Sequence, residues 1–309
     1  MDYIGYVGTY TSNQSEGIYQ FTYKDKQLSN ISLFAKVKNP KYLTMIDNYI
    51  AAACDLETGS GVGVFDYDGN LIDSIVFEER TSCYIGTNDN LLFTANYHGG
   101  TATLLKFENQ KLQLIKKTLI KQKAGCHQIL TYQDKYLVPC LFLDKIMILN
   151  KDFDIVDEIK FEEGAGPRHG VFSKDEKFLY VVGELSNLLY VVNMQTKQIV
   201  ASEELLENHL SHVKDTAAIR LRDDYLYVST RTQDVISVIH VDGKNVKRVQ
   251  VESCAGQHPR DFIIVDNEII VANRFTNTLS VLPIKEGYVQ KETGTVSVPE
   301  AVSIVVRRV

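Results

Sequence analysis

The chain has 309 residues, of which 44% are hydrophobic and 23% are charged, with a net charge of −6 at pH 7. That hydrophobic share is enough for a continuous core, and the mildly acidic balance argues against general binding to nucleic acids or anionic membranes, which depends on a basic field. No apolar run approaches the roughly 18 residues of a membrane span, so we expect neither a nucleic-acid nor a membrane partner.

The start of the chain and its cysteines bear on its compartment. The first residues form neither a basic stretch nor a long apolar stretch, so the sequence shows no signal peptide. Five cysteines without close pairs are typical of reduced thiols in a cytoplasmic protein. Because no C-x-x-C motif and no tightly spaced histidines occur, we expect a cytoplasmic protein without a metal or other cofactor.

Short apolar strand signals recur with a period of about 45 residues along the chain. Each segment consists of an aromatic or aliphatic strand, followed by a small residue and then a variable polar position. The seven segments are 4–9, 49–55, 92–97, 136–141, 179–184, 225–231 and 269–274. Such a period, with several strands per unit, is typical of a propeller with one blade per repeat. We therefore predict an all-β fold, a seven-bladed β-propeller, as a single domain over residues 1–309.

A second set of segments marks the start of the innermost strand of each blade. These lead-in segments are 39–43, 82–85, 125–128, 166–169, 213–216, 258–261 and 298–301. The last has no hairpin after it, and Ile4–Thr9 has no strand before it. The simplest closure pairs Ala301–Val306 with Ile4–Thr9, which leaves no open sheet edge between the chain ends. Elsewhere, Ala201–Asp215 resembles a helix or a long loop.

Both sets of segments carry polar side chains at the same end of the blades. Because equivalent positions converge on the axis of a propeller, we expect these side chains near one mouth of its channel. They are His127, Arg168, His169, Glu184, Arg231, Arg260 and Arg274. Like charges held together repel, so the arginines should gain stability from an anion. The planar donor fork of arginine suits a carboxylate or phosphate, and a neutral histidine can act as a base near pH 7.

Structural roles remain open for the same residues. Arg168 and Arg260 can brace neighbouring blades by bonding backbone carbonyls, and His169 can face a blade interface. Glu184 can serve as the ion-pair partner of an arginine, and His98 can hold a turn.

At these residues the chain resembles the lactonase family of seven-bladed propellers, which includes bacterial 6-phosphogluconolactonases and fungal carboxy-muconate cyclases. The segment 166–169 matches the G-P-R-H of the family, its most specific element. Further resemblances lie at 6–11, 39–43, 183–185, 229–231, 258–262 and 272–274. The chain departs from the family pattern at Cys126, Lys145, Gly183 and Arg274.

The resemblance implies roles for individual residues. In the cyclase branch a histidine, two arginines and a glutamate are implicated in the reaction. They match His127, Arg168, Glu184 and Arg231, which we expect to be catalytic. The side chains expected to bind substrate are His169, Arg260, Arg274, Tyr97 and His98.

The function expected is hydrolysis of a sugar lactone, 6-phosphogluconolactone to 6-phosphogluconate, in the pentose phosphate pathway of carbohydrate metabolism. Water would attack the lactone carbonyl while Arg168 and Arg231 stabilise the oxyanion or anchor the phosphate, and His127 or Glu184 would take the proton. A muconate-type lactonising or isomerising enzyme and a non-catalytic propeller that binds a ligand or protein remain as alternatives. The expected partner is an anionic sugar lactone, bound by a monomer or weak homodimer.

Overall fold

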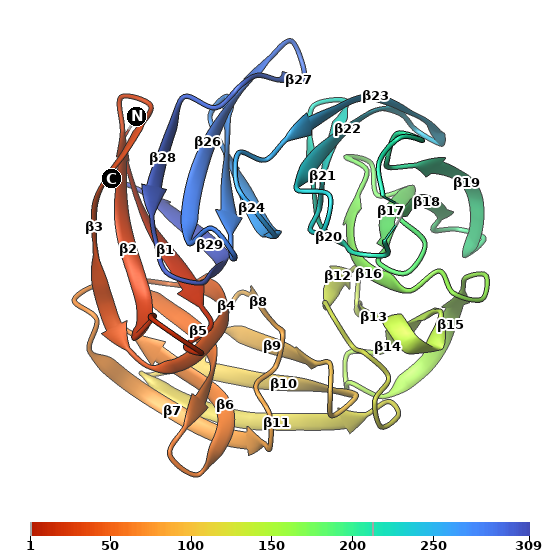
Figure 1. The fold of residues 1–309 in the computed structure, drawn as a ribbon. Helices are drawn as coiled ribbons and strands as arrows, with labels where there is room; N and C mark the ends of the chain where they lie inside the picture. The colour runs from red at the N-terminus through yellow and green to blue at the C-terminus, as the bar shows by residue number, and fades with distance from the viewer. Residues whose placement is uncertain (1, 212) are drawn as a thin grey trace. The chain divides into compact units, whose positions relative to one another are not determined.

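The computed structural model describes residues 2–211 and 213–309, and β-strands make up most of them (Figure 1). Within these ranges the one helical element is a 3₁₀ turn over Leu141–Leu143. The described strands form seven antiparallel sheets, each with a path of four strands. The prediction of an all-β chain with seven blades is therefore confirmed.

Packing divides the chain into two compact units, which are described separately. The first unit consists of Met1–Pro139, Met147–Asp157 and Val296–Val309. The second unit consists of Cys140–Ile146 and Glu158–Thr295.

Three described sheets lie wholly in the first unit, with strand orders β29-β1-β2-β3, β4-β5-β6-β7 and β11-β10-β9-β8. Their strands are β1 Tyr3–Thr9, β2 Gly17–Lys24, β3 Gln27–Lys36, β4 Lys38–Ile46, β5 Tyr49–Leu56, β6 Gly59–Phe65, β7 Leu71–Glu78, β8 Tyr84–Asn88, β9 Leu91–Asn96, β10 Thr101–Glu108, β11 Lys111–Leu119 and β29 Ala301–Arg308. A further sheet joins β12 Leu130–Tyr132, β13 Lys135–Cys140, β14 Lys145–Leu149 and β15 Ile155–Lys160.

Strand β29 closes the first sheet by pairing with β1, so both chain ends belong to one blade. The antiparallel register runs from Tyr3 opposite Arg308 to Thr9 opposite Ala301. The two ends lie side by side (Figure 1). The Val309 N–H donates to the carbonyl of Asp2 at 3.0 Å. The predicted pairing of the C-terminal strand with the N-terminal blade is confirmed.

The second unit holds the sheet paths β16-β17-β18-β19, β20-β21-β22-β23 and β24-β25-β26-β27. Strand β28, which pairs with β26, begins at the end of this unit. Their bounds are β16 Pro167–Phe172, β17 Phe178–Gly183, β18 Leu188–Asn193, β19 Gln198–Glu204, β20 Thr216–Arg222, β21 Tyr225–Thr230, β22 Val235–Asp242, β23 Asn245–Ser253, β24 Pro259–Val265, β25 Glu268–Asn273, β26 Thr278–Lys285, β27 Tyr288–Val289 and β28 Gly294–Ser297.

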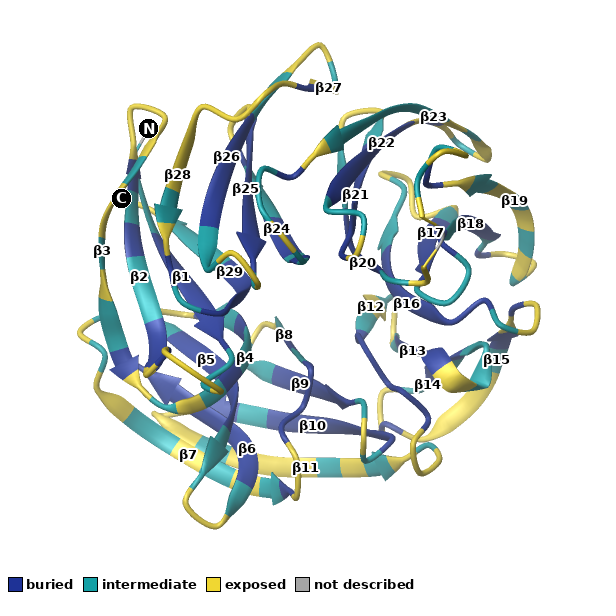
Figure 2. Ribbon diagram, in the orientation of Figure 1, coloured by how far each residue is buried: buried dark blue, intermediate teal, exposed yellow. Residues whose placement is uncertain are grey.

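Burial follows the position of a strand within its sheet. Every residue of β25 is buried, whereas exposure alternates along the outer strand β19, as the colours of Figure 2 show. Strands that are covered on both faces require continuous apolar runs. Tyr180 of β17 and Leu226 of β21, for example, belong to one core cluster that joins two neighbouring sheets of the second unit. The second strand of each blade is thus a rigid support for the residue that follows it.

The stretch 201–215 contains a strand end and a loop. Ala201–Glu204 completes β19, and residues 205–211 and 213–215 form neither helix nor strand. The helical alternative for this stretch is wrong over its described residues, and His212 lies outside them. The glutamates that suggested a helix are divided between the end of β19, which holds Glu203 and Glu204, and the loop, which holds Glu207.

Candidate active site

A repeated backbone contact places one side chain at the same position in several blades. The amide of the residue after the second strand donates to the carbonyl of the residue just before the innermost strand. In the second unit these contacts join Glu184 to Gly166 at 2.8 Å, Arg231 to Asp215 at 3.1 Å and Arg274 to His258 at 3.2 Å. The predicted equivalence of Glu184, Arg231 and Arg274 is therefore confirmed.

The same contact corrects the alignment of the first blade. There the amide of Tyr10 donates to the carbonyl of Glu300 at 3.2 Å, so Tyr10 occupies the position that the repeat assigned to Thr9. Thr9 is buried, and its hydroxyl bonds Ser15 and the carbonyl of Gly17. The threonine is therefore part of the internal hydrogen bonding of its own blade.

Two small residues let the chain turn at Glu184. Gly166 adopts a φ of 62°, a left-handed conformation that glycine reaches without a Cβ clash. A Cβ at Gly183 would lie 2.3 Å from Ser186 Oγ and 2.5 Å from the carbonyl oxygen of Ala165. The departure from the family pattern at Gly183 therefore has a local steric reason.

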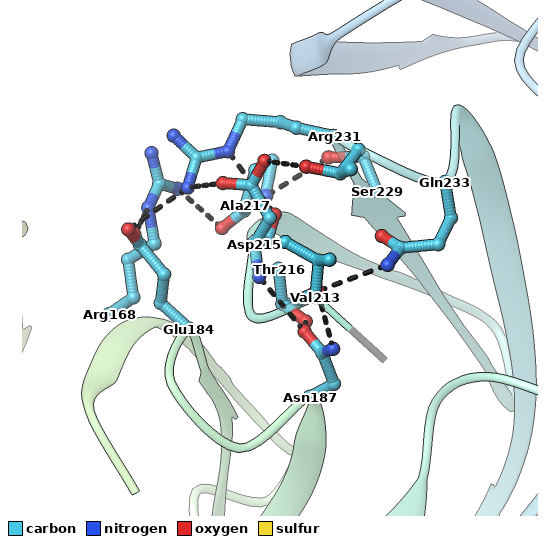
Figure 3. A network of polar contacts seen from close by, with 12 residues as sticks. Arg168, Glu184, Asn187, Val213, Asp215, Thr216, Ala217, Ser229, Arg231 and Gln233 are labelled. Carbon is cyan, nitrogen blue, oxygen red and sulfur yellow. Dashed lines mark hydrogen bonds and ion pairs between the residues drawn. The ribbon is translucent and has the colours of Figure 1, made fainter. Parts of the chain in front are cut away.

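The carboxylate of Glu184 lies between two guanidinium groups (Figure 3). Arg168 Nε is 2.7 Å from Glu184 Oε2, and Arg231 Nη2 is 3.0 Å from Glu184 Oε1. Arg168 comes from β16 in the same blade, and Arg231 follows β21 in the next. The two predicted catalytic arginines are thus brought together through the predicted catalytic glutamate.

Asp215 is a second acidic partner that sequence reasoning missed. Its carboxylate pairs with Arg231 Nη2, and its backbone carbonyl accepts a hydrogen bond from Arg231 Nε at 3.2 Å. Buried Asn187 holds this segment, because its Oδ1 accepts from the amide of Asp215 at 3.1 Å and from the Thr216 hydroxyl at 2.8 Å (Figure 3). The position of Asp215 in lead-in segment 213–216 was the signal in the sequence that could have indicated a role at the site.

These pairings overturn the expectation that Arg168 and Arg231 repel each other in the empty site. Two carboxylates, Glu184 and Asp215, accompany the two guanidinium groups, so the charges balance. Arg168 is 1% exposed, and its Nη1 also donates to the carbonyl of Ala217 at 2.5 Å. Arg168 therefore does brace the neighbouring blade, as the structural alternative held.

The environment keeps Glu184 ionised. Burial alone raises the pKa of this carboxyl, but the charges of Arg168, Arg231 and Arg260 and the hydrogen bond from Arg231 outweigh it. The pKa of Glu184 consequently lies below its usual value. A carboxylate of lowered pKa, with both oxygens engaged, is better suited to holding arginines than to accepting a proton from water.

His258 is a further site residue that sequence reasoning passed over in favour of Arg260 two positions later. Burial is the main cause that lowers its pKa, and Arg231, Arg260 and Arg274 lower it further, to about 3. The imidazole is therefore neutral at physiological pH. The H-P-R-D motif pointed to this segment, but the charges around the ring could not be derived from it.

In the first unit, Tyr97, His98 and His127 form a separate aromatic group. The Tyr97 ring meets the rings of His98 and His127 edge to face, at centroid distances of 5.1 and 5.9 Å. His127 is buried, and burial together with Arg80 and Lys41 lowers the pKa of His98. Asn96, whose Oδ1 accepts from the Gly99 amide at 2.8 Å, holds the turn through its side chain.

His169 lies buried in β16, next to Arg168, in the pair opposite Val182. Among residues 2–211 and 213–309, no three His, Cys, Asp or Glu side chains are grouped so that they could hold a metal ion. In the same ranges no helix is long and apolar enough to cross a membrane.

The chain is similar along nearly its whole length to known proteins. It is 30% identical to the 6-phosphogluconolactonase of Bacillus subtilis (strain 168), with 98% of this chain and 97% of the relative covered. The crystal structure of a Lactobacillus plantarum protein superposes with a TM-score of 0.92 at 25% identity, covering both chains completely. The periplasmic gluconolactonase of Pseudomonas aeruginosa superposes with a TM-score of 0.86 at 21% identity, covering 99% of each chain, which shows the fold alone.

The sequence profile of the family described as "Lactonase, 7-bladed beta-propeller" matches residues 4–306. Together with the relative from Bacillus subtilis and the seven sheets, this match identifies the fold as a seven-bladed β-propeller. The chain belongs to the lactonase family of seven-bladed β-propellers.

Proposed function

We propose that the protein hydrolyses a sugar lactone, with 6-phosphogluconolactone as substrate and 6-phosphogluconate as product, in the cytoplasmic pentose phosphate pathway. Membership of the lactonase family and the name of the relative from Bacillus subtilis support this proposal. A lactone already contains a reactive ester, so the reaction needs positioned cations more than an elaborate nucleophile.

One observation carries the proposal: the guanidinium groups of Arg168 and Arg231 are fixed on a single carboxylate, that of Glu184. Donors that are held in place before the reaction cost no reorganisation when negative charge develops on the carbonyl oxygen. Arg231 uses Nε and Nη2 in its contacts with Asp215 and Glu184. Its Nη1 takes part in none of these contacts, and we assign to it the stabilisation of the oxyanion.

The base is the second element of the proposed mechanism. Glu184 has a lowered pKa and holds two arginines, so we assign it a positioning role. His127 then takes the proton of the attacking water, as the family resemblance suggests. Activity should fall at low pH as His127 is protonated, because an imidazolium has no free lone pair to accept a proton.

The test compares hydrolysis of 6-phosphogluconolactone and gluconolactone by the wild-type protein and the variants His127→Gln, Glu184→Gln and Arg231→Ala. The assay at about pH 6.5 is corrected for spontaneous opening of the lactone. Catalysis that requires His127 and Arg231 supports the proposal. If Glu184→Gln abolishes the low-pH limb of the profile and His127→Gln does not, the base is Glu184. Turnover of neither lactone would leave a binding propeller, and cyclisation of a muconate would make the protein a lactonising enzyme.

A further inference from the structure

We propose that His258, Arg260 and Arg274 form a subsite for a small oxyanion, and that the His258 imidazole takes up a proton when the anion binds. Binding of the oxyanion at this subsite does not depend on any lactonase activity of the protein. Only the assignment of the bound group as the phosphate of a substrate rests on the proposed function.

The backbone of His258 is held in an unusual conformation. Its φ is 62°, in the left-handed region that non-glycine residues seldom adopt, and Pro259 follows it. Two contacts fix this conformation: the His258 amide donates to Asp234 Oδ1 at 2.6 Å, and the His258 carbonyl accepts from the Arg274 amide at 3.2 Å. Gly166 and Glu300, which precede the innermost strands of two other blades, also have a positive φ, so the blade pattern itself sets this backbone conformation.

The His258 side chain is also fixed, but one of its nitrogens is not satisfied. The imidazole packs on Phe275 with a centroid distance of 4.2 Å, and the guanidinium carbon of Arg274 is 5.5 Å from the centroid of the same Phe275 ring. Phe275 is 60% exposed, so this aromatic support borders solvent. His258 Nδ1 is buried and has no hydrogen-bond partner among the described residues. Buried polar atoms are nearly always bonded, so this nitrogen can form a hydrogen bond with a bound group.

Charge around His258 comes from several elements of the second unit. The groups that act on it or on its backbone partner are Arg231 after β21, Arg260 in β24, Arg274 after β25, Asp234 before β22 and Asp215 before β20. Glu184 and Asp215 accompany Arg231. Arg260 and Arg274 add positive charge beside a neutral imidazole, and this combination favours an anion.

The linkage between anion and proton follows from the sign of these charges. Burial and the charges of the arginines together disfavour the imidazolium. An anion that binds beside them supplies negative charge and so raises the proton affinity of His258. By reciprocity, anion affinity must rise as pH falls towards the pKa of His258 in the complex. A tetrahedral oxyanion matches the forked donors of two guanidinium groups and can accept an additional N–H from the imidazolium.

Sulfate is the probe of choice because it does not titrate in the accessible pH range, so any proton taken up must be bound by the protein. Histidine signals are followed by proton–carbon NMR at about pH 6 during a sulfate titration of the full chain. The protein has seven histidines, and His258→Asn identifies the signal of His258. Asparagine is chosen because it tolerates a left-handed backbone. The His258 signal should move towards the imidazolium position, and calorimetry in two buffers should show proton uptake on binding.

Variants define the subsite. His258→Asn should abolish the proton uptake, and Arg274→Gln should weaken sulfate binding roughly tenfold. His240→Gln is the matched control, because His240 is exposed on β22 and packs on Tyr225; it should change neither quantity. Titrations with 6-phosphogluconate and gluconate then distinguish a substrate phosphate from a free inorganic ion, since only the former gains affinity from the sugar acid.

Each outcome decides one of the two proposals. Sulfate binding with proton uptake at His258 but without lactone turnover would overturn the proposed function and keep the subsite. Lactone turnover with no sulfate binding, or with proton uptake that survives His258→Asn, would overturn the subsite and keep the enzyme. If the signal of His258 stays unchanged while sulfate binds, the anion binds elsewhere and the subsite is likewise rejected.

Discussion

Asp55 and Glu184 are both acidic residues at the end of the second strand of a blade, yet their partners differ in kind. Asp55 accepts hydrogen bonds from Asn39 Nδ2 at 2.7 Å, Ser60 Oγ at 2.5 Å and the Thr81 hydroxyl. Glu184 instead binds the guanidinium groups of Arg168 and Arg231. One carboxylate is satisfied mainly by neutral donors and the other by cations.

The pKa of each carboxyl reflects this difference. Burial raises both, and both end below their usual value. For Asp55 the hydrogen bonds from Asn39, Ser60 and Thr81 outweigh burial, with a smaller contribution from the charge of Lys41. For Glu184 the charges of Arg168 and Arg231 lead the opposing effects. The neutral donors around Asp55 stabilise the local structure, whereas the cations that Glu184 binds can also interact with a ligand.

The largest expected effect is on stability. Glu184→Ala leaves Arg168 buried without its carboxylate partner, so the free energy of unfolding should fall by about 3–5 kcal/mol. Asp55→Ala leaves neutral groups unpaired and should cost about 1–3 kcal/mol. Urea denaturation of both variants measures the difference. Equal losses would mean that cationic and neutral partners are energetically equivalent here, against the comparison drawn above.

Substitutions near Asp55 and near Glu184 should differ more in their effect on activity than in their effect on stability. Arg231→Ala should lower kcat/KM for the lactone about 10²–10³-fold, the usual cost of removing one oxyanion donor. Asp55→Asn should leave kcat/KM within about twofold of the wild-type value, because it removes no charge from Arg168, Glu184 or Arg231. Steady-state kinetics on folded variants, verified by circular dichroism, provides the measurement. Equal losses in the two variants would remove Arg231 from its assigned role.

The arginines that act on His258, which are Arg231, Arg260 and Arg274, should also affect how stability depends on pH. The pKa of His258 is about 3 in the folded chain, whereas an unfolded histidine titrates at about 6.5. As pH falls from about 6.5, the unfolded chain binds this proton first, so stability is lost on acidification through that window. His258→Asn should flatten the loss between about pH 6 and pH 4.5, relative to His240→Asn. The free energy of unfolding is measured by urea denaturation at each pH. If its dependence on pH is the same in both variants, the neighbours of His258 do not suppress protonation of its imidazole.

The smallest expected effect belongs to the conservative change at Asp55. Asp55→Asn retains an acceptor oxygen for Ser60 or Thr81 and loses only the charge, so the free energy of unfolding should fall by about 0.5–1.5 kcal/mol. The lowered pKa of Asp55 predicts that this difference is present at neutral pH and shrinks as pH falls through the folded-state pKa. A denaturation series from neutral to acidic pH measures it. A constant difference would contradict the ionised state assigned to Asp55.

Sequence repetition was sufficient to predict the blades and their closure, because strand period and turn chemistry are local properties. It also placed Glu184, Arg231 and Arg274 at one equivalent position, which the shared backbone contact confirms. It could not predict that Arg168 and Arg231 share one carboxylate, since that depends on side-chain directions across two blades. The one-residue offset at Thr9 has a different origin: Thr9 lies opposite Ala301 as Gly183 lies opposite Pro167, so the repeat was aligned one residue too early in the first blade.

His258 shows a second limit of sequence reasoning. Sequence reasoning gave it no role, and only the packed structure shows how burial and three arginines suppress its charge. The roles assigned to His127, Tyr97 and His98 stay predictions. Ring contacts group them in the first unit, but these contacts do not identify which of the three meets a substrate.

The pairing of β1 with β29 has a consequence for protein synthesis. Strand β1 has as its inner neighbour β29, which follows all the other described strands in the chain, so this blade cannot be completed until residues 301–308 have been synthesised. Until then the apolar strand Tyr3–Thr9 presents an unpaired edge, which chaperones or neighbouring nascent chains can contact. Strands β16 to β27, which support the arginines, all lie within residues 158–295, so they can form before β29 closes the first sheet. Synthesis of β29 therefore sets the earliest moment at which this sheet can close.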